Sequence, residues 1–182
     1  MFTQFRYLYC DLRSWKCCGF RDSFYTFFEG GVWATIIYRI NRSFFLIDIP
    51  IIKIPIRLFC FILFKLSEVL FGISLPPAVD IGPGLHIGHT GLIVINYQVK
   101  AGKNLSIGNG IIIGAAGLGK IGAPVVGNNV FIGSGAKILG KISVGNNSRI
   151  GANAVVISNV PEGATVVGVP AKVVKIQNLS DM

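Results

Sequence analysis

Residues 125–156 read VVGNNVFIGSGAKILGKISVGNNSRIGANAVV, and an aliphatic residue recurs at every sixth position of this stretch. Glycine follows the recurring residue in four of the units, and a small or aliphatic residue returns four positions later in each unit. Six consecutive matches are improbable by chance, so this repeat decides the fold of the segment. The recurring residues are Val126, Ile132, Ile138, Val144, Ile150 and Val156.

A six-residue unit of this kind predicts a short strand followed by a tight corner. The aliphatic residue points inward and stacks on its equivalents, while Gly and Asn accept the backbone angles of the corners. Three units close one triangular coil of a parallel β-helix, whose coils hydrogen-bond along the axis. The same rule holds upstream from Ile81 and from Ile95. We therefore expect a mainly β domain with about four coils between Val79 and Val160.

The repeat slips in two places. The step from Ile87 to Ile95 is eight residues, and the step from Ile113 to Val126 is thirteen. A coil accommodates extra residues only by pushing them outward at a corner, and loops on a rigid scaffold are where function usually lies. The first slip falls just after His89.

The first 73 residues have a different composition. They hold all but one of the thirteen phenylalanines and both tryptophans. Their apolar runs predict helices shorter than the roughly 18 uncharged residues of a membrane span, and we expect Pro50 and Pro55 to interrupt them. Arg57, Lys65 and Glu68 share a face at helical spacing on an otherwise apolar helix. This pattern is typical of a helix that lies on a membrane surface, and an oligomer contact is the alternative.

These differences divide the chain into three parts: a hydrophobic helical region at 1–73, a β-helix at 74–176 and a tail at 177–182. The net charge of +9 favours phosphates or an anionic membrane as partners, whereas nucleic acid is disfavoured because no run of Lys and Arg occurs. The four cysteines lack paired spacing, so we expect reduced thiols. With no secretory signal evident, the expected location is the cytoplasm or the inner face of the cytoplasmic membrane.

Both histidines lie in HIGHTGLIVIN, residues 86–96. Between Ile81 and Val160 the sequence has no Asp, Glu or Cys. If this domain moves protons near neutral pH, an imidazole is therefore the general base. His89 falls at the slipped corner, whereas His86 is expected to point outward from a flat face and to be inert. A metal site is disfavoured because two histidines alone do not complete a usual ligand set.

Four stretches, HTGLIVIN, IGSGAKILGKISVG, IGANAVV and GVPAKVVK, resemble the hexapeptide-repeat acyltransferases over Leu75 to Lys175. The chain is similar to serine acetyltransferase, and closer to bacterial acetyltransferases of capsule or colanic-acid-type polysaccharides, which share a short hydrophobic N-terminal part. The resemblance implies a left-handed parallel β-helix, a homotrimer with active sites between subunits, and direct acetyl transfer from acetyl-CoA to a hydroxyl without a metal.

The same resemblance assigns roles to particular residues. His89 matches the catalytic histidine. The aspartates that orient this histidine in serine acetyltransferase are absent here, so we expect Asp80, the nearby carboxylate, or else Asn96 or a backbone carbonyl, to orient the ring. Lys172 and Lys175 either meet the phosphates of acetyl-CoA or are solvated surface residues. The expected acetyl-CoA positions are Gly114, Ala115, Ser134, Ala152, Ala171, Lys172 and Lys175.

The acceptor is the point at which the chain departs from serine acetyltransferase. Ser74 and Gly88 stand where that enzyme has aspartates, and Ala123 stands where it has a second histidine. The sequence therefore favours a sugar or glycan intermediate as the acceptor. Serine O-acetylation in cysteine biosynthesis and a non-catalytic trimeric scaffold are the alternatives.

Overall fold

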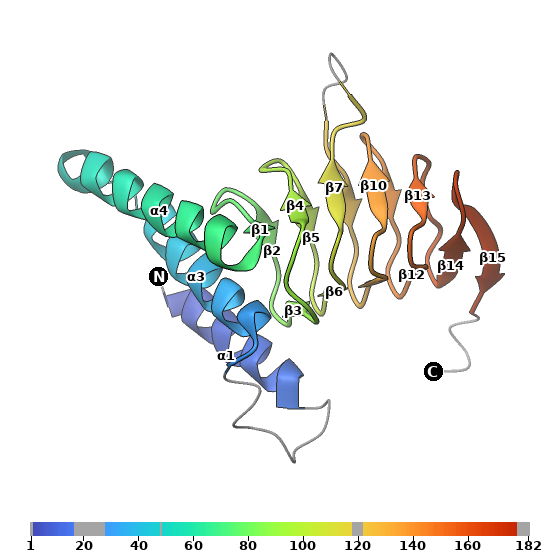
Figure 1. The fold of residues 1–182 in the computed structure, drawn as a ribbon, viewed down its shortest axis with the longest axis horizontal. Coiled ribbons are helices and arrows are strands. Elements are labelled where there is room, and N and C mark those ends of the chain that lie inside the picture. Colours follow the sequence, from blue (N-terminus) through green and yellow to red (C-terminus); the bar gives the residue numbers. More distant parts are fainter. Residues whose placement is uncertain (1, 17–27, 48, 118–121, 178–182) are drawn as a thin grey trace.

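The structure, a computed structural model, describes residues 2–16, 28–47, 49–117 and 122–177. Helices come first in the chain and lie together at one end of a long coil of strands (Figure 1). The helices are α1 (Phe2–Lys16), α3 (Gly30–Phe45) and α4 (Pro50–Phe71).

The strands form three sheets along the coil, and consecutive strands visit the sheets in turn. Sheet A contains β1 (Ile73–Ser74), β4 (Ile93–Ile95), β7 (Ile112–Gly114), β10 (Lys137–Leu139) and β13 (Val155–Val156). Sheet B contains β2 (Asp80–Ile81), β5 (Lys100–Ala101), β8 (Val125–Val126) and β11 (Ser143–Val144). Sheet C contains β3 (His86–Ile87), β6 (Ser106–Ile107), β9 (Phe131–Ile132), β12 (Arg149–Ile150), β14 (Ala164–Val167) and β15 (Lys172–Ile176).

Neighbouring strands in each sheet are parallel, as the repeat predicts, except that β15 runs antiparallel to β14. All six recurring aliphatic residues of 125–156 are buried inside the coil. The first strand, β1, starts at Ile73, so the coil begins earlier than the expected Val79. Full burial of an Ile or Val side chain stabilises the fold by about 1.5–3 kcal/mol, so the stacked interior is the main source of stability in this region.

The corners use asparagine and glycine, as expected. At the corner between sheets B and C, the Asn104 amide donates to Asn129 Oδ1 at 2.8 Å, and the Asn129 amide donates to Asn147 Oδ1 at 2.9 Å. All three residues have positive φ angles, which Asn tolerates better than most residues. The ladder joins successive coils along one edge.

Helix α4 corrects one expectation. It begins at Pro50 and continues through Pro55, which was expected to interrupt it. Pro55 lies close to the start of the helix, where its missing N–H removes only one backbone hydrogen bond. The helix ends at Gly72, whose φ of 65° forms the left-handed cap.

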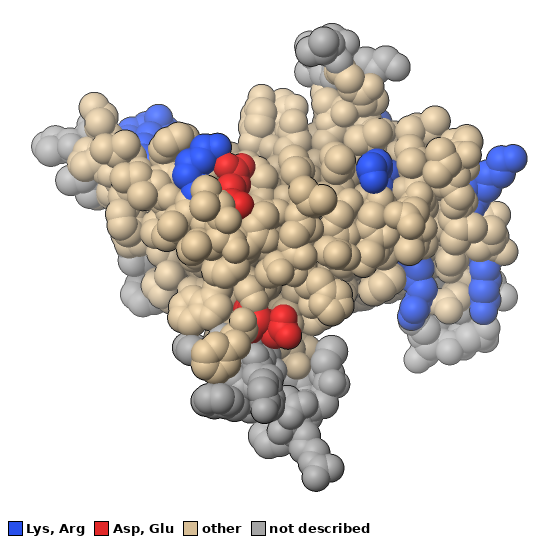
Figure 2. Space-filling view, viewed as in Figure 1, with Lys and Arg blue, Asp and Glu red and all other residues tan. Residues whose placement is uncertain are grey.

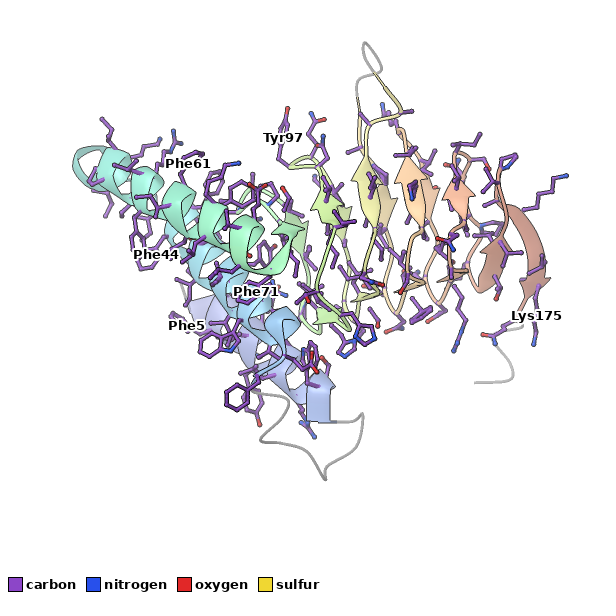
Figure 3. All side chains as sticks on the ribbon, in the orientation of Figure 1. Phe5, Phe44, Phe61, Phe71, Tyr97 and Lys175 are labelled. Atoms are coloured by element: carbon purple, nitrogen blue, oxygen red, sulfur yellow. The ribbon has the colours of Figure 1, made fainter. Side chains whose placement is uncertain are left out.

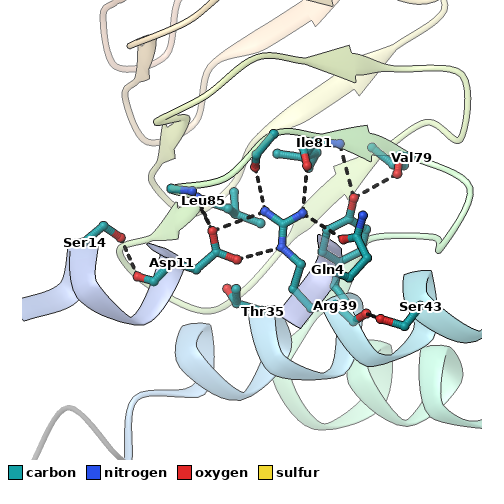
Figure 4. Close-up of polar contacts among 12 residues, drawn as sticks. Gln4, Asp11, Ser14, Thr35, Arg39, Ser43, Val79, Ile81 and Leu85 are labelled. Atoms are coloured by element: carbon teal, nitrogen blue, oxygen red, sulfur yellow. Dashed lines mark hydrogen bonds and ion pairs between the residues drawn. The ribbon is translucent and has the colours of Figure 1, made fainter. Parts of the chain in front are cut away.

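A buried polar network joins the helices to the first coil (Figure 4). Arg39 on α3 and Asp11 on α1 form an ion pair at 2.7 Å, with side chains 1% and 0% exposed. The Arg39 guanidinium also donates to the carbonyls of Ile81 and Gly82 at 2.7 and 2.6 Å. Asp11 Oδ1 accepts the backbone N–H groups of Gly84 and Leu85. These bonds satisfy backbone groups of the first coil. No earlier coil is present among the described residues to pair with these groups, because β2 and β3 are the first strands of their sheets.

Among the described helices, none combines the length and the sustained hydropathy needed to cross a membrane. Cys10 and Cys60 are free thiols, while Cys17 and Cys18 lie outside the described residues. The tail expected at 177–182 also lies outside them, apart from Gln177.

Candidate active site

His89 lies exposed in the turn between β3 and β4, at the corner between sheets C and A. Ile87 pairs with Ile107 and Ile95 pairs with Ile113, so this corner holds two more residues than the next one along the coil. The slip seen in the sequence is therefore real. The extra chain reverses through Gly91 and Leu92, which have φ angles of 102° and 51°.

The end of α4 supports this corner. Gly91 donates its N–H to the carbonyl of Phe71, and Ile93 donates to the carbonyl of Gly72, each at 3.0 Å. A Cβ on Gly72 would lie 3.2 Å from the Gly91 Cα and the Leu92 N, so the two backbones are closely packed. The N-terminus of α3 lies against the same turn, because a Cβ on Gly30 would clash with the methyl group of Thr90. The helical layer thus holds the loop that carries His89.

His86 is more enclosed than expected. It points out of sheet C, but the indole of Trp15 on α1 covers it, with the ring centroids 4.4 Å apart. Its Nδ1 lies 3.2 Å from the Ser106 hydroxyl. Burial lowers the pKa of His86, and the nearby His89 lowers it further. His86 is therefore neutral at pH 7 and is held by packing, whereas the His89 ring faces solvent.

The residues expected to orient His89 have other printed partners. The carboxylate of Asp80, on β2, accepts a hydrogen bond from Arg42 at 2.8 Å. Asn96 Oδ1 accepts the N–H of Gln98 at 2.9 Å, within the corner between sheets A and B. Neither contact involves His89, so the identity of an orienting residue stays a prediction.

Glu68, which the sequence analysis assigned only to the charged face of a helix, lies near this corner. Ser74, at one of the positions where an aspartate was missing, donates its hydroxyl to Glu68 on α4. Lys65 also donates to Glu68, at 2.6 Å. Partial burial pushes the pKa of Glu68 upward, but the hydrogen bonds from Lys65 and Ser74 and the charge of Lys65 outweigh it and lower the pKa. Glu68 therefore brings a stable negative charge to β1, the strand next to β4. Glu68 lies on α4 and Ser74 lies on β1, on either side of the helix cap at Gly72, so helical periodicity could not predict this contact.

Three of the residues expected to contact acetyl-CoA, Ser134, Ala152 and Ala171, lie along the same edge of the coil as His89. Successive coils are linked there by hydrogen bonds from Gly110 N to Gly91 O, from Gly135 N to Asn109 O and from Asn153 N to Ser134 O. Ser134 and Ala152 therefore follow His89 along one edge, with Ala152 three coils away, roughly 14 Å. Ala171 continues this edge, since its N–H bonds to the carbonyl of Val155.

The rest of the expected set lies elsewhere. Gly114 and Ala115 lie with Asn96 at the corner between sheets A and B, where a Cβ on Gly114 would lie 3.3 Å from Asn96 Cβ. Lys172 and Lys175 are exposed on β15, at the far end of the coil from the helices (Figure 3). One chain therefore places the expected contacts on the two edges of sheet A and on β15 of sheet C, and does not gather them in one pocket.

A separate cleft of about 430 Å³ lies between α1 and the corner of sheets B and C. None of its lining residues belongs to the candidate set; they are Thr3, Arg6, Tyr7, Cys10, Pro83 and Lys103. Within the described residues, no three His, Cys, Asp or Glu side chains gather as a metal site would require.

Comparison with known proteins identifies the coil and the enzyme class. The family model for the bacterial transferase hexapeptide (six repeats) matches residues 123–158. A serine acetyltransferase of Helicobacter pylori is 43% identical over 148 residues, covering 79% of this chain and 81% of its own length. A serine acetyltransferase of Buchnera aphidicola is 40% identical over 110 residues, covering 59% of this chain. The chain spans only 42% of the length of that relative.

The solved structure of the serine acetyltransferase of Brucella abortus in complex with coenzyme A superposes with a TM-score of 0.81. It is 29% identical, and the match covers 95% of this chain and 68% of the other. The match includes the helices as well as the coil. The helical N-terminal region therefore has a counterpart in that enzyme, although its composition differs from that of the coil.

These relatives correct the expected acceptor. A sugar or glycan acceptor was favoured because three acceptor-side residues of serine acetyltransferase are absent, yet the relatives at about 40% identity are serine acetyltransferases. The expectation was wrong because HTGLIVIN and GVPAKVVK belong to the shared coil and carry no information about the acceptor. The absence of single side chains was also a poor guide, since Glu68 reaches one of those positions from another element.

Proposed function

The chain belongs to the serine acetyltransferase family of hexapeptide-repeat transferases, and on that premise we propose that it transfers the acetyl group of acetyl-CoA to the hydroxyl of serine. Family membership confirms the expected acyltransferase class and acetyl-CoA as its co-substrate. The observation that supports the proposal most is the position of His89. Its exposed imidazole lies on the same edge as Ser134 and Ala152, so an extended thioester along that edge would end beside a base.

In this mechanism His89 accepts the proton of the serine hydroxyl as the oxygen attacks the thioester carbonyl. A C–O bond forms, and the C–S bond of the tetrahedral intermediate then breaks. The imidazolium returns its proton to the departing thiolate, so the histidine ends as it began. Backbone N–H groups at the corner would stabilise the negative oxygen of the intermediate.

Glu68 supports serine as the acceptor. Serine carries an ammonium group, and an ionised carboxylate beside it contributes binding through a charge-assisted hydrogen bond. Ser74 and Lys65 hold Glu68 in its ionised form next to the strand that follows the His89 corner. We therefore assign Glu68 a role in acceptor binding, in place of the aspartates that the sequence lacks.

The active site requires more than one subunit. His89, Ser134 and Ala152 lie on one edge of sheet A, whereas Gly114 and Ala115 lie on the other. One ligand can contact both edges only if one edge of a protomer faces the opposite edge of its neighbour, which is a heterologous contact that closes into a ring. Val94 and Ile112 are exposed on the outer face of sheet A, where a neighbour would cover them. A homotrimer with a left-handed coil, as in the family resemblance, meets this requirement.

The acceptor is tested by thiol release from acetyl-CoA with and without serine. The proposal expects release that depends on serine, and it expects Glu68→Gln to raise the KM for serine about tenfold, as loss of one charge-assisted bond would. Lys100→Gln, on the outer face of sheet B, is the matched control and should leave both parameters unchanged. Thiol release that ignores serine would refute serine as the acceptor. Acetyl-CoA that fails to bind would favour the non-catalytic scaffold.

The shared site is tested by mixing two inactive variants. His89→Ala disables one edge, and Ala115→Trp blocks the other. If each site uses one edge from each of two subunits, equal mixing and re-assembly should restore about a quarter of the sites. Activity that stays at the level of the separate variants would show that each chain works alone.

A further inference from the structure

The cleft between α1 and the corner of sheets B and C takes no part in the proposed reaction. Four α1 residues line it, and their spacing of three and four positions places them on one face of the helix. They are Thr3, Arg6, Tyr7 and Cys10. Pro83 and Lys103 form the opposite wall, at the same corner of two successive coils. One wall of the cleft therefore comes from the helical layer and the other from the β-helix.

Contacts outside the cleft hold both walls in place. Asp11 on α1 accepts the N–H groups of Gly84 and Leu85 at 2.7 and 2.8 Å (Figure 4). On the coil side, the backbone N–H of Lys103 donates to Asn128 Oδ1 at 2.9 Å. Because the backbone is fixed on each side, the cleft is already formed in the free protein, as small-molecule sites usually are.

Arg6 and Lys103 bring one positive charge to each wall. Neither side chain makes a hydrogen bond or an ion pair with the described part of the chain. Asp11, the carboxylate of α1, does not neutralise them, because both of its oxygens accept hydrogen bonds from Arg39. Figure 2 shows the Lys and Arg side chains along the coil standing apart from one another, whereas this cleft gathers two cations from separate elements.

The remaining lining suits an organic molecule. The ring of Tyr7 is held by the guanidinium of Arg39, whose Cζ lies 5.2 Å from the ring centroid. Pro83 offers a second apolar surface. The hydroxyls of Thr3 and Tyr7 have no hydrogen-bond partner among the described residues, so both are free to donate to a ligand. The volume of about 430 Å³ falls in the range of small-molecule sites and exceeds what an inorganic ion fills.

We propose that this cleft binds a small phosphate monoester, with the phosphate between Arg6 and Lys103 and the organic part against Tyr7 and Pro83. A phosphate monoester carries a charge of about −1.5 to −2 at pH 7 and several acceptor oxygens, so it matches two cations better than a single carboxylate does. The guanidinium of Arg6 would bind two of these oxygens in a fork, and Lys103 would act as a point charge. Nucleotides and sugar phosphates share this chemistry. The cleft lies at a different corner from His89, so binding here does not depend on the proposed reaction.

Isothermal titration calorimetry of the full chain tests the proposal with adenosine 5′-monophosphate, glucose 6-phosphate, inorganic phosphate and adenosine. Both monoesters should bind, inorganic phosphate should bind more weakly, and adenosine should not bind detectably. Tighter binding of the adenosine phosphate would identify nucleotides as the ligand class, and tighter binding of the glucose phosphate would identify sugar phosphates. Arg6→Gln and Lys103→Gln should each weaken monoester binding about tenfold or more, because each loses a charge-assisted hydrogen bond.

Two control variants separate this site from general charge and from the acetyl-CoA edge. Lys141→Gln removes one positive charge at the exposed corner between sheets A and B, and it should bind the monoesters as the parent chain does. Ala115→Trp, which blocks one proposed acetyl-CoA edge, should also bind them normally. Serine-dependent thiol release should be unchanged in Arg6→Gln and Lys103→Gln, so failure of this proposal is distinguishable from failure of the catalytic one.

Cys10 provides an independent readout, because its thiol is exposed in the cleft. A bound monoester should slow alkylation of Cys10 by iodoacetamide in the parent chain, as measured by peptide mass spectrometry, and should protect it much less in Arg6→Gln. The proposal would be overturned if neither monoester binds, if adenosine or inorganic phosphate binds as tightly as the monoesters, or if both cleft variants keep the parent affinity. Loss of binding in Ala115→Trp would also overturn it, because the ligand would then occupy the acetyl-CoA edge.

Discussion

The β-helix and the helical layer are stabilised in different ways. In the β-helix, each coil repeats the same inward aliphatic positions, and any one of them resembles its neighbours. The helical layer is attached through groups that occur once: Arg39, Asp11 and the carbonyls of Ile81 and Gly82. Loss of one coil position should therefore be partly tolerated by the stack, whereas loss of one member of the polar network leaves a buried charge without its partner.

The largest effect on stability should come from Arg39→Met. It leaves Asp11 buried and unpaired, which costs about 3–5 kcal/mol. Urea unfolding followed by circular dichroism measures the change. The double variant R39M/D11L should recover part of the loss, because it removes the stranded charge. If the double variant is no more stable than R39M, the network's carbonyl bonds matter more than its ion pair.

A slightly smaller loss is expected within the coil. Ile132→Ala leaves a cavity between Ile107 and Ile150 in the stack and should cost about 2–5 kcal/mol, nearer the low end if neighbouring coils relax. Val125→Ala, in the same coil but pointing outward, should change the free energy of unfolding by about 0.5 kcal/mol or less. Equal losses for the two variants would contradict the inward assignment of the repeat.

The smallest effect concerns His86, where the two regions meet. Burial lowers its pKa below the ordinary value of 6.5, so the unfolded chain binds a proton more readily than the folded chain. Stability should therefore fall as the pH drops through 6.5 and stop falling once the folded His86 is also protonated. His86→Gln should flatten this part of the stability profile, as measured by thermal unfolding between pH 7.5 and pH 5 (about the range over which histidine titrates). A profile that keeps its slope in His86→Gln would assign the effect to another group.

The sequence predicts the coil well because the repeat is local. The six-residue spacing of the aliphatic residues from Val126 to Val156 is enough to predict that each side chain points into the coil. The slip at His89 appears in the sequence as a change of that spacing. The helical layer has no such signal. Nothing in the sequence links Asp11 to Arg39, since the contact depends on how two helices pack on the first coil. Trp15 over His86 and Glu68 at Ser74 were missed for the same reason.

The acceptor was mistaken for a related reason. The stretches that carry the family resemblance form the coil, while the acceptor meets residues that several elements bring together. In the sequence analysis, Ser74 and Gly88 were treated as isolated positions that lack an aspartate. In the structure, the Ser74 hydroxyl binds the carboxylate of Glu68, which comes from α4. The outward corner position of His89 was therefore the part of the candidate site that the sequence predicted best, and the catalytic role of His89 stays a prediction.

The central claim is that His89 is the base for acetyl transfer to serine, and the comparison of His89→Ala with His86→Gln tests it most directly. Steady-state kinetics with acetyl-CoA and serine should show a loss in kcat of about 10²–10⁴-fold for His89→Ala. His86→Gln, three residues away on the covered strand, should retain near-normal kcat at pH 7.5 (about one unit above the ordinary histidine pKa). Full turnover by the folded His89→Ala protein would contradict the account.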